Sequence, residues 1–315
     1  MKVGMLFPGY PSQFVGMGKD LYDNSRTIQE YFEDASNCLG MNFVKLCFAS
    51  SDADLARVSH AYPSLFLTSV STAHMIKEVC PTMTISGMAG YGVGEYGALY
   101  MANSMTFPDG LYLLNKFSQL YVQLHEDVAL KTVIVKGFTD KAIKELCEEH
   151  GVAIVSFESN RHLVTGTFEA LEGFIEAAKK AGSGRVKEAD MIQGVHTELL
   201  DGLVEQLSPY LTKVDFYAPE VPVVSGLTGK PLSSAQKVQD SLMDLLVKPL
   251  SWKSVLKQFA DYDMLLVPGP SKALVAELSA LYPDKMIMGI ESMADIEALQ
   301  ALVNGGMADT VEQTI

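Results

Sequence analysis

The segment from Gly87 to Gly97 constrains the fold more than any other part of the chain, because it holds five glycines in eleven residues. An apolar run at Thr82–Ala89, which we expect to be a buried strand, leads into it. A predicted helix at Val93–Met101 follows. Glycine at this density predicts a tight strand-to-helix turn with positive φ angles or a close approach of another group.

One interpretation of this turn is a dinucleotide-binding loop. Gly92–Gly97 spells G-x-G-x-x-G between a strand and a helix, which is the context that this motif requires. The dinucleotide fold then needs a second strand ending in Asp or Glu about 20 residues further on. The chain instead continues into another predicted helix at Asp109–His125. The loop motif is present without its partner strand.

A second interpretation is a nucleophile elbow, G-x-S-x-G, at Gly90–Gly94. An elbow exposes its middle residue above the sheet and directs backbone N–H groups at an oxyanion. Here the middle residue is Gly92, which has no side chain to act as nucleophile. The third interpretation is a structural corner without chemistry, and this segment alone leaves all three open.

Predicted strands and helices alternate along most of the chain, which indicates a mostly parallel α/β sheet covered by helices on both faces. The middle of the chain changes to a β-α-β-β-α-β order over about 60 residues, as in the ferredoxin-like unit. We therefore predict a large domain formed by residues 1–128 and 192–315. A small ferredoxin-like domain, residues 129–191, is inserted into it.

Composition excludes several classes of function. The chain has 315 residues with 38 acidic and 24 basic side chains, a net charge of −14, whereas non-specific binders of nucleic acid or anionic membranes carry the opposite sign. No apolar run reaches the roughly 18 residues of a membrane span. The four cysteines have no metal-ligand spacing. We expect a cytoplasmic protein that needs neither a metal nor another cofactor.

Several segments, taken in order, form a more specific pattern. They are Phe7–Gln13, Ala61–Leu65, Gly90–Leu99, Val195–Thr197, Lys248–Trp252 and Val267–Leu274. Together they resemble the malonyl-CoA:acyl carrier protein transacylases, the acyltransferases of fatty-acid and polyketide synthesis, over nearly the whole chain. The resemblance implies an α/β-hydrolase-like large domain with an inserted ferredoxin-like domain. It also implies acyl-CoA and acyl carrier protein as ligands, and it allows a synthase as a further partner.

The resemblance assigns roles to particular residues. In the family a serine attacks the thioester and a histidine acts as base and then as acid, and His196 matches that base. Two backbone N–H groups that hold the oxyanion match Tyr10 and Val93, and the carbonyl that orients the base matches Lys248. Lys116 falls where a family arginine pairs with the malonyl carboxylate.

The departures from the family pattern lie in the catalytic pocket. Gly92 stands where the family has its serine, Tyr91 replaces the preceding histidine, and Tyr10 and Tyr62 replace two glutamines. Without the hydroxyl no acyl-enzyme forms at position 92, and loss of a triad serine typically costs on the order of 10⁶ in turnover. The sequence therefore predicts a degenerate transacylase, a pseudoenzyme in that reaction. The alternatives are a thioester hydrolase that uses water activated by His196, and a dinucleotide-binding module.

Overall fold

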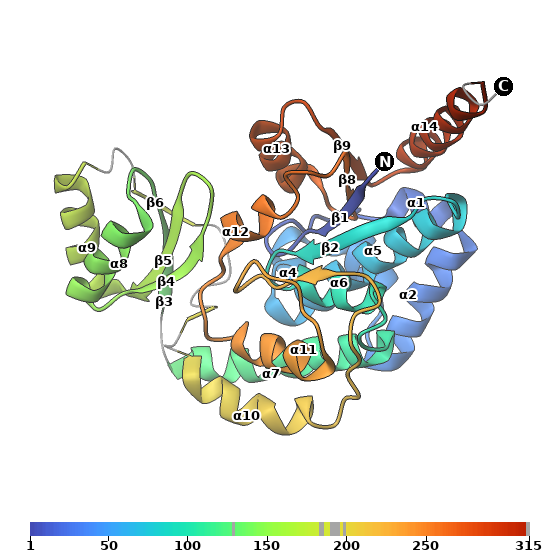
Figure 1. The fold of residues 1–315 in the computed structure, drawn as a ribbon. Coiled ribbons are helices and arrows are strands. Elements are labelled where there is room, and N and C mark those ends of the chain that lie inside the picture. The colour runs from blue at the N-terminus through green and yellow to red at the C-terminus, as the bar shows by residue number, and fades with distance from the viewer. Residues whose placement is uncertain (128–129, 183–185, 190–195, 198–199, 313–315) are drawn as a thin grey trace.

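The computed structural model describes residues 1–127, 130–182, 186–189, 196–197 and 200–312, and it contains two sheets (Figure 1). The larger sheet has the strand order β7-β2-β1-β8-β9, and its neighbouring strands pair in parallel. These strands are β1 (Val3–Phe7), β2 (Ile85–Gly90), β7 (Val223–Val224), β8 (Met264–Pro268) and β9 (Met286–Ile290). The predicted fold class, an α/β protein with a mostly parallel sheet, is confirmed.

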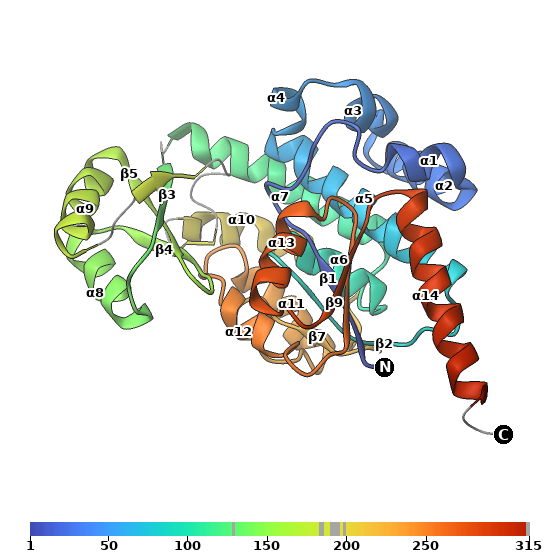
Figure 2. The ribbon, with the colours of Figure 1, turned by 90° about the horizontal axis from the view of Figure 1, so that it is seen from above.

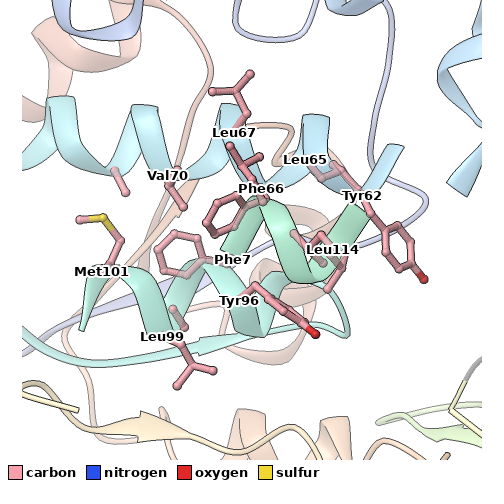
Figure 3. Packing of buried hydrophobic residues seen from close by; sticks show 14 of the residues in the cluster. Phe7, Tyr62, Leu65, Phe66, Leu67, Val70, Tyr96, Leu99, Met101 and Leu114 are labelled. Atoms are coloured by element: carbon pink, nitrogen blue, oxygen red, sulfur yellow. The ribbon is translucent and has the colours of Figure 1, made fainter. Parts of the chain in front are cut away.

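Helices cover both faces of this sheet because alternate strand residues point to opposite sides. In β1, Met5 and Phe7 belong to one apolar cluster and Leu6 to another. Figure 3 shows Phe7 beside Phe66 and Leu99 in the larger cluster. The first face carries α2 (Arg26–Leu39), α5 (Val58–Val79), α6 (Gly94–Met101) and α7 (Phe107–Asp127). The second carries α12 (Trp252–Lys257) and α13 (Lys272–Leu281).

The remaining helices of the large unit surround these layers. They are α1 (Lys19–Asn24), α3 (Phe43–Ala49), α4 (Asp52–Leu55), α10 (Asp201–Leu211), α11 (Ala235–Asp244) and α14 (Met293–Glu312). Helices α1 and α2 are separate elements. Ser25 is extended between them, and its hydroxyl caps α2 by accepting from Ile28 N–H. None of the described helices is long and apolar enough to cross a membrane.

The smaller sheet is antiparallel, with the order β4-β5-β3-β6. Its strands are β3 (Leu130–Val135), β4 (Ala153–Phe157), β5 (His162–Thr167) and β6 (Val186–Glu188), joined through α8 (Asp140–His150) and α9 (Phe168–Lys180). This is the β-α-β-β-α-β order expected from the sequence. Both helices begin at a threonine whose hydroxyl accepts a backbone N–H, as N-caps do.

Two backbone hydrogen bonds join the smaller sheet to the larger unit. Phe157 N–H donates to the Leu250 carbonyl at 2.8 Å, and Leu250 N–H donates to the Val155 carbonyl at 2.9 Å. Strand β4 thus continues its hydrogen bonding onto the segment that precedes α12. Figure 2 shows the unit of β3–β6 lying beside the large sheet, with α12 on the side that faces it.

Candidate active site

The glycine-rich turn between β2 and α6 has the backbone of an elbow. Gly92 at its tip has a φ of +53°, in the left-handed region. A Cβ on Gly90 would lie 1.9 Å from the carbonyl carbon of Gly94, and a Cβ on Gly94 would lie 2.4 Å from the carbonyl oxygen of Phe7. Gly90 and Gly94 therefore allow the turn to fold onto itself and onto β1. Because that backbone is already packed, and α7 rather than a strand follows α6, the structure does not favour a dinucleotide loop.

The tip of the elbow faces His196. A Cβ built on Gly92 would lie 3.1 Å from Nε2 of His196 and 4.0 Å from Cδ1 of Leu250. The fold thus brings together the base position and the nucleophile position that the sequence singled out. The distance is shorter than most Cβ contacts, so the imidazole occupies part of the space that a side chain at position 92 would need.

His196 is held by backbone groups of one turn. Its own φ is +56°, its N–H donates to the Leu246 carbonyl at 3.1 Å, and its Nδ1 bonds to the Leu245 carbonyl. A carbonyl only accepts, so Nδ1 carries the proton and the lone pair of Nε2 points toward Gly92. Burial lowers the pKa of His196 to about 4, against the opposing effect of the Leu245 bond. The imidazole is therefore neutral at pH 7, the form that a general base requires.

The carbonyl that orients His196 corrects one prediction, because it belongs to Leu245 and not to Lys248. Helical hydrogen bonding continues past the end of α11, with Lys248 N–H donating to the Asp244 carbonyl at 2.8 Å. This turn places the Leu245 carbonyl, three residues earlier than expected, against the imidazole. The Lys248 ammonium instead pairs with the Asp244 carboxylate at 2.7 Å on the surface.

The two predicted oxyanion donors lie on backbone that borders the elbow. Val93 directly precedes α6, and within the described part of the chain its N–H has no hydrogen-bond acceptor. Tyr10 lies in the loop after β1, where Ser12 N–H donates to the Gly9 carbonyl at 3.0 Å. A Cβ on Gly9 would lie 2.0 Å from the Tyr91 carbonyl oxygen, so this loop packs directly on the elbow. The placement is compatible with the oxyanion role that the resemblance implies.

A small cavity of about 20 Å³ adjoins His196. Its lining is formed by Tyr62, Val93, Tyr96, Leu114, Phe117, His196, Leu245 and Leu246. The ring of Tyr62 stacks on that of Phe117 with centroids 5.4 Å apart and planes 1° from parallel. Figure 3 shows Tyr62, Leu114 and Tyr96 together at one side of the large apolar cluster. Tyr62 thus lies at the cavity that adjoins His196.

Lys116, predicted to bind a substrate carboxylate, lies outside this cavity. Its ammonium donates to Gln119 Oε1 at 3.3 Å and lies 5.4 Å from the ring centroid of Tyr210. Phe117 faces the cavity in its place. One residue along an α-helix turns the side chain by about 100°, so Lys116 and Phe117 point in different directions from α7.

Glu95, in the first turn of α6, is a functional candidate that the sequence analysis missed. Its side chain is fully buried, and its carboxylate accepts from Gly226 N–H at 2.7 Å and from the Ser241 hydroxyl at 2.8 Å. Burial raises the pKa of Glu95 to about 7, with the two hydrogen bonds opposing the rise. The available signal was an acidic residue between apolar neighbours in a buried helix. Glu95 ties the elbow helix to the segments around β7 and α11.

Comparison with known proteins decides the family. The family model described as an acyl transferase domain matches residues 5–264. The chain belongs to the acyl transferase family. The malonyl CoA-acyl carrier protein transacylase of Salmonella typhimurium is 30% identical over 279 residues, which cover 85% of this chain and 89% of that relative.

Solved structures of such acyl transferases have the same fold. The acyl carrier protein S-malonyltransferase of Vibrio cholerae superposes with a TM-score of 0.90 at 24% identity, over 95% of this chain and all of that one. A malonyl-transacylase solved in complex with its type II PKS acyl-carrier protein superposes with a TM-score of 0.86 at 25% identity. That likeness covers 94% of this chain and 98% of the other.

In this acyl transferase the side chain of Tyr91 contacts Glu158 and Trp252. Its hydroxyl donates to Glu158 at 2.8 Å, and its ring meets that of Trp252 edge-on with centroids 5.1 Å apart. Burial and the adjacent Glu158 raise the pKa of Tyr91 well above its ordinary value, so the phenol is a neutral donor and not a nucleophile. Arg161 pairs with the other oxygen of Glu158.

Tyr91 also borders a cleft of about 740 Å³ between the two sheets of the acyl transferase. The loop Pro8–Ser12, Trp252 and Glu277 contribute from the large unit, and Glu158 and Arg161 from the small one. Neither Glu158 nor Arg161 was singled out in the sequence, where nothing distinguishes them from surface charges. Among the described residues, no cluster of three or more His, Cys, Asp or Glu side chains is arranged to hold a metal ion.

Proposed function

We propose that this acyl transferase binds acyl thioesters of coenzyme A or acyl carrier protein without forming an acyl-enzyme. The observation that carries the proposal is the position of Gly92. Gly92 lies at the elbow tip, where a Cβ built on it would lie 3.1 Å from the unprotonated Nε2 of His196. It has no side-chain atom that could be acylated. The proposal is further supported by Val93, the candidate oxyanion donor that directly follows Gly92 and precedes α6.

The missing step follows from the chemistry of a serine at this point. Its oxygen would bond to the thioester carbonyl carbon, its proton would pass to Nε2 of His196, and the C–S bond would then break. The same nitrogen would return the proton to the leaving thiolate. In this chain the proton acceptor, Nε2 of His196, is present, but the attacking oxygen is absent. The first bond, between that oxygen and the thioester carbon, therefore cannot form.

Ligand binding is supported by the relatives and by the cleft. Proteins of similar sequence are named for malonyl-CoA and acyl carrier protein, and one similar structure was solved with its acyl-carrier protein. The cleft of about 740 Å³ that borders Tyr91 and the Pro8–Ser12 loop is of the size that cofactor-like ligands occupy. We assign the thioester arm to this cleft.

We propose a thioester hydrolase as a second candidate, on the basis of one observation. The cavity of about 20 Å³ beside His196 is large enough for one water molecule. A water activated by Nε2 would bond to the carbonyl carbon, and the thiol would leave with the transferred proton, giving a free acid. This route requires no side chain at position 92.

Intact-mass spectrometry of the wild-type protein after incubation with acetyl-CoA and malonyl-CoA tests the proposal. We expect no covalent adduct with wild type or with Gly92→Ala, and one acyl group on Gly92→Ser. A stoichiometric acyl adduct on wild type would refute the proposal. Titration calorimetry with the same thioesters checks binding, and absence of heat at millimolar ligand would also count against it.

Thiol release distinguishes the hydrolase from the binding protein. A hydrolase releases coenzyme A continuously, and release stops in His196→Asn, because Asn tolerates the positive φ but cannot accept the proton at this position. A binding protein releases none above background in either form. Release that is unchanged in His196→Asn would exclude the His196 route.

A further inference from the structure

The cavity next to His196 is apolar and very small. Its volume of about 20 Å³ admits one group of the size of a water molecule or a methyl. The stacked rings of Tyr62 and Phe117 close one side of it. The cavity is bounded by Val93, which follows Gly92, and by His196, whose Nε2 lies 3.1 Å from a Cβ built on Gly92, so an acyl group bonded at position 92 would lie next to this space.

No described residue that lines this cavity carries a positive charge. The cation predicted for this role, Lys116, is turned toward Gln119 and Tyr210. Transfer of a carboxylate from water into an apolar space without a partner is costly, so an acidic acyl group would lose its hydration and gain no ion pair.

Neighbouring titratable groups respond to the same surroundings. Burial raises the pKa of both Tyr62 and Tyr96 and lowers that of His196 to about 4, so each of these groups is kept in its neutral form. The space that would receive the acyl group therefore disfavours charge of either sign. The small volume of the cavity and its apolar lining therefore both disfavour a carboxylated acyl group.

We propose that the pocket opposite Gly92 takes a short uncharged acyl group, such as acetyl, and rejects a carboxylated one, with Phe117 as the residue that sets this choice. The inference rests on the proposed function, since it names the acyl class for the same site. It differs from the malonyl specificity for which the relatives are named.

The test uses Gly92→Ser, in which the acyl group remains covalently attached and is counted by intact mass. Three thioesters are compared: acetyl-CoA, malonyl-CoA and acetoacetyl-CoA. Acetoacetyl has the same number of heavy atoms as malonyl but no charge, so it separates charge from size. We expect acylation by acetyl-CoA at least about tenfold faster than by malonyl-CoA, and acetoacetyl-CoA to be faster than malonyl-CoA.

Substitution of Phe117 in the Gly92→Ser background tests the residue itself. Phe117→Arg is expected to raise malonyl transfer relative to acetyl transfer. Phe117→Leu, the matched control, enlarges the pocket and should favour acetoacetyl while malonyl remains slow. Circular dichroism and melting curves establish that each variant is folded. If Phe117→Arg does not fold, the rates of Phe117→Leu with malonyl-CoA and acetoacetyl-CoA still test the role of Phe117.

Equal rates with malonyl-CoA and acetoacetyl-CoA, a preference for malonyl-CoA, or no acylation of Gly92→Ser by any of the three would each overturn the inference. The proposed function is tested separately, because it depends on the wild-type chain binding thioesters and forming no adduct. Within the proposed function, absence of acylation in Gly92→Ser would contradict only the acylation expected of that variant. An adduct on wild type would overturn the proposed function and leave the acyl preference to be measured directly.

Discussion

The hydroxyl of Tyr91 donates a 2.8 Å hydrogen bond to Glu158, so the residue beside the elbow tip is fastened to the loop between β4 and β5. Glu158 is buried and also pairs with Arg161. A buried carboxylate depends on such partners, because an unpaired charge in this position would be strongly unfavourable. Tyr91 therefore has a structural role between the two sheets and no role as a substitute nucleophile.

Tyr91→Phe removes this bond and keeps the ring against Trp252. We expect the free energy of unfolding to fall by about 2 kcal/mol, since hydrogen bonds to charged groups contribute roughly 1.5–3 kcal/mol. Urea denaturation measures the change. Tyr217→Phe is the control, because Tyr217 is 55% exposed, and it should cost less than about 0.5 kcal/mol. Equal stabilities of the two variants would show that the Tyr91 bond contributes nothing.

Gly92→Ala adds a methyl group at positive φ next to the imidazole. Gly151 offers a matched comparison, with a φ of +64° and no heavy atom within 4 Å of its missing Cβ. Gly151→Ala should cost about 1 kcal/mol from backbone strain alone. Gly92→Ala should cost about 1 kcal/mol more, because His196 must move by a few tenths of an ångström. Differential scanning calorimetry of the two variants provides the comparison, and no difference would mean that the imidazole moves freely.

The contribution of Glu95 to the free energy of unfolding decreases as pH rises. Its pKa is about 7 in the folded chain and near 4.5 when unfolded, so between these values the unfolded chain loses the proton first. This shift corresponds to about 3 kcal/mol, fully lost above pH 7. Glu95→Gln should abolish this dependence, while its amide keeps a bond to Ser241. The difference in stability between wild type and Glu95→Gln, measured at pH 4.5 and at pH 8, isolates the Glu95 contribution, and an unchanged pH profile in Glu95→Gln would contradict it.

His196 acts in the opposite direction. Its pKa is about 4 folded and 6.5 unfolded, so the unfolded chain binds the proton first as pH falls through this range, and stability is lost on acidification. The loss is at most about 3 kcal/mol. The contributions of Glu95 and His196 largely cancel between about pH 4.5 and 6.5 in wild type. In His196→Asn the free energy of unfolding should fall with rising pH, because only the Glu95 contribution remains. In Glu95→Gln it should rise with pH, because only the His196 contribution remains. The same pH dependence in both variants would refute the two opposing contributions.

The sequence predicted the parts of the site that depend on local pattern. The glycine-rich turn at Gly92 and the α/β architecture follow from spacing and alternation, and the resemblance supplied His196. It did not predict which carbonyl meets His196, because Leu245 and Lys248 lie in one turn and only the path after α11 decides between them. Lys116 and Phe117 are neighbours on α7, and only the packing of that helix decides that Phe117 is the one that lines the cavity.

Contacts between residues far apart in the chain could not be predicted from the sequence. Glu158 and Arg161 look like ordinary surface charges until β4 and β5 are placed beside the elbow, and the burial of Glu95 depends on Gly226 and Ser241, far along the chain. The helix α11 was not predicted either, although Ser234 caps it by accepting from Lys237 N–H.

The segment from Leu245 to Leu250 has one further consequence. Its first carbonyl orients His196, and its last residue carries the backbone bonds to β4 and lies next to Gly92. The orientation of the imidazole and the attachment of the smaller sheet therefore depend on the same six residues of backbone.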